Sequence, residues 1–122
     1  MSLSQETPVR LITPAEYGFL CRVARAVGKP PDDVGLSAEA LVEPMADGGM
    51  GSLRFTDPAR DGRERRLGEV FAEGAFTDRD GVPVSFSVNL DDRGRLFELD
   101  LWRVDFKPIQ SVPSDDESVT IA

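Results

Sequence analysis

The 122-residue sequence contains no histidine, one cysteine (Cys21) and one tryptophan (Trp102). Without histidine, the chain lacks the most common general base, the Ser-His and Cys-His pairs that activate nucleophiles, and the usual ligand of transition metals. A single cysteine cannot form a disulfide within the chain, and zinc sites built on cysteine need more than one. We therefore expect a protein that is not an enzyme, with no cofactor and no metal ion, in a reducing, cytoplasmic location.

Positive charge and long apolar runs are also scarce. The chain has 14 Lys and Arg residues against 22 Asp and Glu residues, which gives a net charge of −8. Nucleic-acid binding needs clustered basic residues, and an anionic membrane surface repels an acidic chain. No apolar run approaches the roughly 18 residues that a membrane-spanning helix needs, and residues 1–8 have no apolar core of signal-peptide length. We expect neither nucleic acid nor membrane as a partner. The acidic charge either keeps the protein soluble or docks a basic protein.

One helix is predicted over residues 14–27. Thr13 is a capping residue, Pro14 suits the first helical position, and Glu16 stands where a capping box requires it. The apolar residues that follow recur at spacings of three and four and form one stripe: Tyr17, Leu20, Val23, Ala24 and Val27. Gly28 is a natural end for this helix, and the two prolines that follow it prevent its continuation.

Five strands are predicted, at about 40–45, 51–55, 67–77, 82–90 and 96–105. The clearest alternation of apolar and polar residues runs from Val84 to Leu90, and the turns at 78–81 and 91–94 contain the Asp and Gly residues that close hairpins. In the last strand, apolar residues occur at both parities, so either a bulge switches the faces or the second face is also covered.

The fold class that follows is α+β, with one N-terminal helix packed on a roughly five-stranded antiparallel meander sheet in two layers. We expect a flexible N-terminus at 1–8, a single domain at 9–110 and an acidic, mobile tail at 111–122.

The last hairpin is strongly acidic and carries the tryptophan. Glu98, Asp100 and Trp102 share parity on one strand, and Trp is frequent at the centre of protein interfaces. The candidate residues for binding a protein partner of basic charge are Asp91, Asp92, Glu98, Asp100, Trp102 and Asp105. Paired carboxylates also perform acid–base chemistry when burial separates their pKa values, but Arg93, Arg95 and Arg103 stand close enough to neutralise them.

An alternative site uses the glycine-rich turn after residue 46 and the acidic turn after residue 77. Its candidate residues for a small molecule or a metal ion are Asp47, Gly48, Gly49, Asp78 and Asp80. The glycine-rich turn lacks the Gly-Lys-Ser/Thr ending of a phosphate loop, and the spacing from Asp78 does not match a calcium-binding EF-hand loop. Both turns are also what ordinary hairpins require.

Four segments together resemble a family of small uncharacterised bacterial proteins that is classed as a domain of unknown function. These segments are residues 10–13 leading to Glu16, 47–53, 78–84, and 89–94 continuing to 98–102. The resemblance covers about residues 9–109, consists of turns and strand patterns, and transfers no catalytic residue. In size, acidity and α+β design, the chain is also similar in type to the immunity proteins of bacterial toxin systems.

These observations lead to one main hypothesis and one alternative. The main hypothesis is a non-enzymatic, cytoplasmic protein-binding module of the immunity type, which neutralises a basic partner through an acidic sheet face. The alternative is a small-molecule or metal-binding domain. A homodimer through a sheet edge or the Trp102 face is compatible with both.

Overall fold

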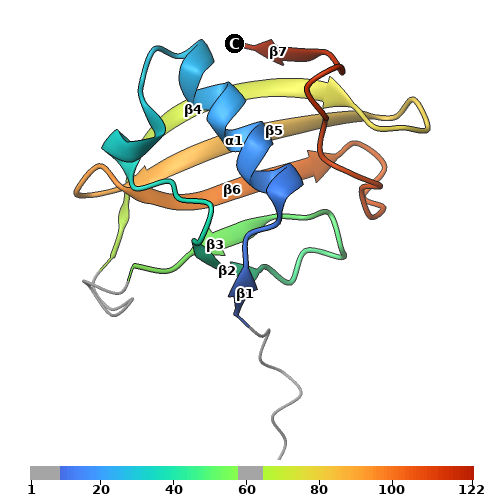
Figure 1. Cartoon of the computed structure of the whole chain (residues 1–122). Coiled ribbons are helices and arrows are strands. Elements are labelled where there is room, and N and C mark those ends of the chain that lie inside the picture. Colours follow the sequence, from blue (N-terminus) through green and yellow to red (C-terminus); the bar gives the residue numbers. More distant parts are fainter. Residues whose placement is uncertain (1–8, 58–64) are drawn as a thin grey trace, which may run out of the picture.

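The computed structural model describes residues 9–57 and 65–122, which form an α+β fold with one α-helix and one antiparallel sheet of seven strands (Figure 1). The helix is α1 (Pro14–Ala26), and a short 3-10 helix η1 (Pro31–Val34) follows it. The strands are β1 (Arg10–Leu11), β2 (Leu41–Pro44), β3 (Leu53–Phe55), β4 (Leu67–Thr77), β5 (Pro83–Asp91), β6 (Leu96–Arg103) and β7 (Val119–Ile121). Their order across the sheet is β1-β2-β3-β6-β5-β4-β7.

Helix α1 begins as the sequence predicts. The hydroxyl of Thr13 accepts a hydrogen bond from the backbone N–H of Glu16 at 3.1 Å, and the Glu16 carboxylate accepts one from the N–H of Thr13 at 2.9 Å. The carboxylate also binds the guanidinium of Arg10 on β1, so it links the first strand to the helix. The helix ends at Ala26, and Gly28 adopts the left-handed conformation (φ 80°) that ends helices.

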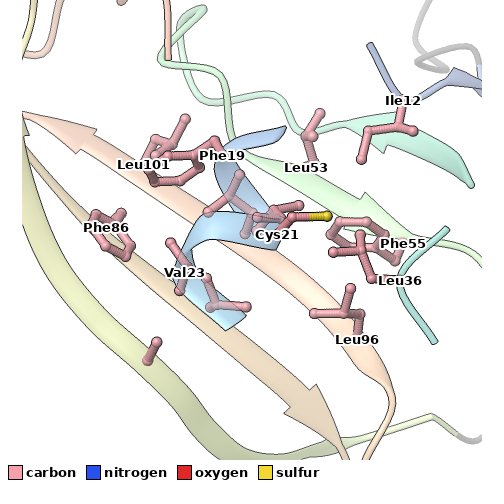
Figure 2. Packing of buried hydrophobic residues seen from close by; sticks show 14 of the residues in the cluster. Ile12, Phe19, Cys21, Val23, Leu36, Leu53, Phe55, Phe86, Leu96 and Leu101 are labelled. Carbon is pink, nitrogen blue, oxygen red and sulfur yellow. The ribbon is translucent and has the colours of Figure 1, made fainter. Parts of the chain in front are cut away.

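The core lies between α1 and one face of the sheet (Figure 2). The largest buried side chain is Phe19, which is 1% exposed and makes edge-to-face ring contacts with Phe76 of β4 and Phe86 of β5. The predicted stripe omitted Phe19, although it included Leu20, Val23 and Ala24, which are all buried. The aromatic contacts fix where α1 crosses the long strands.

All five predicted strands are present, and two short edge strands extend the sheet. Strand β1 pairs with β2, and β7 pairs with β4 through Gly74, Ala75 and Phe76. Strand β7 lies within the segment expected to be a mobile tail, and Val112, Val119 and Ile121 of that segment pack against the core. The sheet therefore extends beyond the predicted domain boundary at residue 110. Residues 1–8, the predicted flexible N-terminus, lie outside the described residues.

A bulge explains why apolar residues occur at both even and odd positions of the last strand. Asn89 pairs with Glu98, but the next residue of β5, Leu90, pairs with Leu96, so Phe97 is the extra residue on β6. The bulge returns Leu96 to the core side, where it is buried with Leu99 and Leu101. Of the two explanations that the sequence left open, the structure has the bulge. No helix within the described residues is long and apolar enough to cross a membrane.

Candidate protein-binding face

The register of the strands defines a second face of the sheet, opposite the core, which we call the outer face. Directly paired residues of an antiparallel sheet point to the same side. Trp102 pairs with Ser85 and Asp100 with Ser87, whereas Val84, Phe86 and Val88 point into the core. The outer face includes Glu43, Arg54, Val70, Glu73, Ala75, Ser85, Ser87, Asn89, Glu98, Asp100, Trp102 and Thr120.

The outer face is acidic. Among the residues just named, four carry a carboxylate and one, Arg54, carries a guanidinium, which binds Glu98 across the strands at 2.7 Å. Arg54 also lies 5.5 Å from the ring centroid of Phe97, the bulge residue. This ion pair leaves the carboxylates of Asp100 and Glu73 as the acidic groups in the middle of the face.

A short chain of hydrogen bonds holds the carboxylate of Asp100. The hydroxyl of Ser87 donates to Oδ1 of Asn89 at 2.8 Å, and Nδ2 of Asn89 donates to Oδ2 of Asp100 at 3.1 Å. Burial, followed by repulsion from Glu98, raises the pKa of Asp100, and the hydrogen bond from Asn89 opposes this shift. A positive charge near Asp100 would therefore be favourable.

Three exposed apolar residues end the outer face at the end of β6. Trp102 is 52% exposed, Val104 51% and Phe106 66%. The rings of Trp102 and Phe106 contact each other with 5.9 Å between their centroids. Phe106 has a φ of 64° and is the only non-glycine residue with positive φ in the described part of the chain. That conformation is unfavourable for a bulky residue, so the turn after β6 holds this exposed ring in place at a cost.

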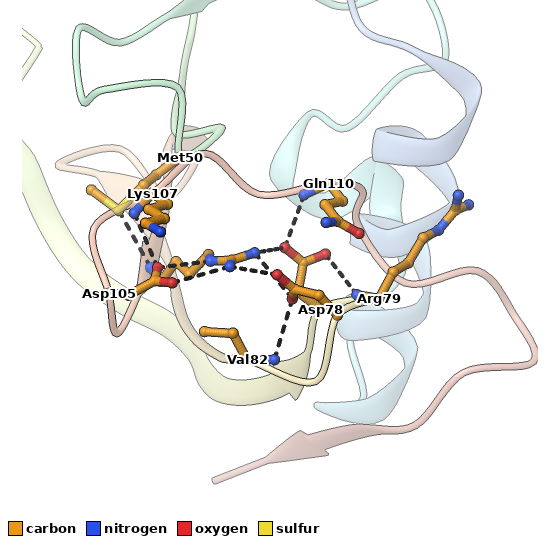
Figure 3. Close-up of polar contacts among 9 residues, drawn as sticks. Met50, Asp78, Arg79, Val82, Asp105, Lys107 and Gln110 are labelled. Carbon is orange, nitrogen blue, oxygen red and sulfur yellow. Dashed lines mark hydrogen bonds and ion pairs between the residues drawn. The ribbon is translucent and has the colours of Figure 1, made fainter.

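The residue that holds the turn is Arg103, which points to the other side of the sheet from Trp102. Figure 3 shows the polar contacts around Asp78 and Asp105. The side chain of Arg103 is 5% exposed and binds three carboxylates. Nη1 donates to Asp78 at 2.7 Å, Nη2 donates to Asp80 at 2.6 Å, and Nε donates to Asp105 at 2.8 Å. With two further bonds, Nη1 to Asp80 and Nη2 to Asp105, every N–H of the guanidinium has a carboxylate partner. We call these four residues the Arg103 cluster.

Within the Arg103 cluster, the pKa values of Asp78 and Asp105 are shifted downward. The guanidinium lowers the pKa of Asp105 to about 2. Burial raises the pKa of Asp78, but hydrogen bonds from the N–H groups of Gln110 and Arg79 and from Arg103 outweigh it, so the net shift is downward. Through these ion pairs, Arg103 ties the turn before β5 to the turn after β6.

The structure brings together only part of the predicted partner-binding set. Glu98, Asp100 and Trp102 lie on the outer face, as their shared parity indicates. Asp105 lies in the Arg103 cluster instead, and Asp92 is exposed in the turn between β5 and β6.

Asp91 does not lie on an exposed face, because it is 2% exposed. Its carboxylate binds Nε of Arg65 at 2.9 Å and accepts hydrogen bonds from the N–H groups of Arg93 and Arg95. Burial raises its pKa, but these hydrogen bonds more than offset that, so the net shift is downward. Asp91 shapes the hairpin turn and anchors Arg65.

The alternative ligand-binding residues lie in two turns, and their carboxylates have structural contacts. Asp47 accepts hydrogen bonds from the N–H groups of Met50 and Ser52 and so closes its own turn. Gly48 and Gly49 have φ values of 76° and 83°, which explains why glycine stands there. Asp78 and Asp80 bind Arg103, whose guanidinium occupies the place that a bound cation would take. Within the described residues, no group of three or more acidic or cysteine side chains could hold a metal ion.

The sequence interpretation missed three features of this region. It treated Arg103 as a charge that neutralises Glu98 and Asp100, whereas Arg103 points away from them. It gave no role to Phe106, since positive φ at a phenylalanine leaves no mark in the sequence. It did not place Glu73 beside the acidic strand, because that position depends on the β4–β5 register. The alternation of residues on β4 and β5 was the one signal that pointed to Glu73.

The fold and this face define a small α+β domain with an open, acidic and partly aromatic sheet face. The chain belongs to a family described as a domain of unknown function (DUF6984), whose sequence pattern matches residues 9–113. This confirms the predicted resemblance to an uncharacterised family. No curated protein and no solved structure matches the chain.

Proposed function

We propose that this protein is a non-enzymatic, cytoplasmic protein-binding module that docks a basic protein on the outer face of its sheet. The observation that carries the proposal is Trp102, which is half exposed and lies on the same face of β6 as Glu98 and Asp100. In this proposal the fold has two layers, with α1 on one face and the partner on the other. The partner-binding residues are Glu98, Asp100 and Trp102, joined by Glu73 and Phe106.

Two physical arguments support this role for the outer face. Exposed apolar groups within a polar surface are typical of interaction sites, and tryptophan contributes more binding energy than most residues when a partner buries it. Acidic groups around such an anchor select for a basic partner and speed its approach. The net charge of −8 acts in the same direction over a longer range.

The role resembles that of immunity proteins, which neutralise a toxin by binding it. We therefore propose that the protein is bacterial, that it neutralises its partner by binding it, and that it catalyses no reaction. The small-molecule or metal alternative is less favoured, because Arg103 satisfies Asp78 and Asp80 and backbone N–H groups satisfy Asp47.

The experiment is affinity capture from a bacterial lysate with three forms of the protein. One is the wild type, one carries Glu98→Ala, Asp100→Ala and Trp102→Ala, and one carries Asp115→Ala and Asp116→Ala. The third form removes the same number of carboxylates from a segment away from the outer face. Urea unfolding first establishes that both variants are folded.

We expect a basic protein to be retained in a fixed ratio by the wild type and by the Asp115/Asp116 variant, and to be lost with the triple variant. Retention should fall as salt is raised, because salt screens the charges. A partner that the triple variant holds as well as the wild type does would show that the outer face is not the binding site. A second copy of this chain as the sole partner would contradict the proposed basic partner.

A further inference from the structure

We infer that a hollow on the outer face is a subsite for an arginine side chain of the partner, with Glu73 in its lining and with Asp100 and Trp102 next to it on β6, where Trp102 serves as an aromatic wall. This inference rests on the proposed function, since it assigns the chemical group that the outer face recognises. Three independent features of the face support it: the shape of the hollow, the placement of its charges and the turn that presents its aromatic rings.

The hollow exists because the central residues of the face are small. It has a volume of about 430 Å³ and is lined by Glu73, Ala75, Ser85, Ser87 and Thr120 together with their neighbours Gly74, Phe86 and Ala122. Its floor is formed by the short side chains of β4 and β5. Asp100 and Trp102 do not line the hollow themselves, but they are the cross-strand neighbours of Ser87 and Ser85, which do, so they lie next to it on β6. Glu73 stands on the β4 side, opposite Asp100 across Ser87.

The charges around the hollow suit a cation. Asp100 and Glu73 are separated by one intervening strand, and therefore by about 10 Å between backbones. Asn89 binds only Oδ2 of Asp100, and Oδ1 has no hydrogen-bond partner within the described residues. A guanidinium between the two strands would give Oδ1 a donor and offset the burial and repulsion that disfavour the charged form of Asp100. The planar group could also stack on the indole of Trp102, two residues along β6.

The aromatic wall is held in position before any partner arrives. Asp105 folds back onto Arg103, and its Oδ1 also accepts the N–H of Lys107, which fixes the turn on both sides of Phe106. In this turn Phe106 takes a positive φ and rests against Trp102. An exposed phenylalanine contributes little to stability, so its unfavourable backbone conformation is better explained by function than by packing.

The experiment follows the indole N–H signal of Trp102 and the backbone amide signals of Asp100 and Ser87 by NMR while capped peptides are added. One peptide has three arginines, the second has three lysines, and the third has three citrullines, which match arginine in shape but carry no charge. We expect the arginine peptide to shift the signals of Trp102, Asp100 and Ser87. We expect about tenfold weaker binding of the citrulline peptide, which lacks both the charge and the cation–π attraction. Equal binding of the citrulline or the lysine peptide would overturn the assignment to a guanidinium.

Variants distinguish binding at this subsite from non-specific attraction of the peptide to the acidic surface. Asp100→Asn should abolish most of the response to the arginine peptide, while Leu67→Ala, at the far end of β4, should leave it unchanged. Glycine adopts a positive φ without strain, so Phe106→Gly should be at least as stable to urea as the wild type. It should nevertheless bind the arginine peptide several-fold more weakly, because it lacks the ring. Unchanged peptide binding by Phe106→Gly would overturn the role of the preformed aromatic wall.

The two levels of the proposal fail in different ways. If the arginine peptide causes no shift at Trp102 while the triple variant still loses the captured partner, the arginine subsite is wrong and the outer face remains the binding site. If the triple variant keeps its partner, the proposed function is wrong whatever the peptides do.

Discussion

Replacement of Arg103 by leucine removes the one cation of the Arg103 cluster and keeps a side chain of similar bulk. The three carboxylates of Asp78, Asp80 and Asp105 then face one another without a positive charge. Asp80 and Asp105 are about one-third exposed and can turn to water. The side chain of Asp78 is fully buried and cannot. The cost of the substitution therefore arises mainly at Asp78.

The expected loss follows from burial. Removing one partner of a buried ion pair costs about 3–5 kcal/mol, because it leaves an uncompensated charge. A domain of this size is stable by about 5–15 kcal/mol, so Arg103→Leu should remove a large part of its stability and lower Tm by roughly 10–20 °C. Arg54→Leu is the matched control, since Arg54 binds Glu98 at the same 2.7 Å but is 47% exposed. Its cost should be about 0–1 kcal/mol.

The pH dependence separates lost charge pairing from lost packing. In the wild type the pKa values of Asp78 and Asp105 lie below the unfolded value of about 3.9. Their contribution is therefore fully present above about pH 4 and is lost as pH falls toward about 2. In Arg103→Leu the buried Asp78 no longer has the guanidinium, so its pKa rises and protonation relieves the repulsion. The stability difference between the two proteins should be largest at neutral pH and should narrow as pH falls.

The assay is urea unfolding, followed by the fluorescence of Trp102 and by circular dichroism, at several pH values from neutral to about 3. If the free energies of unfolding of the wild type and Arg103→Leu differ by less than about 1 kcal/mol at neutral pH, the reasoning about Asp78 is refuted. A large difference that stays constant as the carboxylates protonate would show that Arg103 acts through packing alone.

Three further predictions concern other parts of the fold. Thr13→Ala removes the side-chain acceptor of the capping box and should cost about 1 kcal/mol in urea unfolding; a cost near zero would show that the cap is dispensable. Asp100→Asn should leave stability at pH 7 equal or higher, since the pKa of Asp100 is raised and its ionisation opposes folding; a clear loss of stability would contradict that sign. Gly74→Val places a Cβ in steric conflict with the carbonyl oxygen of Thr120, so β7 should detach and the N–H of Ala122 should exchange faster in hydrogen-exchange measurements; an unchanged exchange rate at Ala122 would contradict this prediction.

The helix and the long strands were predictable because their signals are local. Thr13, Pro14 and Glu16 lie within four residues of one another, and the alternation of β5 is complete within one strand. The edge strands β1 and β7 were not predictable in this way. They contain two and three residues, and they form only because β2 and β4, which are distant in sequence, present free edges.

The site was predictable only where the spacing of residues along one strand determines which face of the sheet they share. Glu98, Asp100 and Trp102 share a face because they are spaced by two, and the structure confirms this. Asp91 is predicted to bind the partner, but its carboxylate is buried and turns inward to Arg65 and to its own hairpin, which the sequence does not show. The role of Arg103 was not predicted, because its partners Asp78 and Asp80 lie in a different hairpin. No local sequence pattern shows that these residues come into contact.

The most direct test of the proposed binding face uses the only tryptophan as a reporter. The captured basic partner is purified and titrated into the wild type, and the emission of Trp102 is recorded at low and high salt. We expect a blue shift as the partner buries the half-exposed indole, with a midpoint that moves to higher concentration as salt increases. Unchanged emission while a second method shows the complex to form would place the partner elsewhere and contradict the proposal.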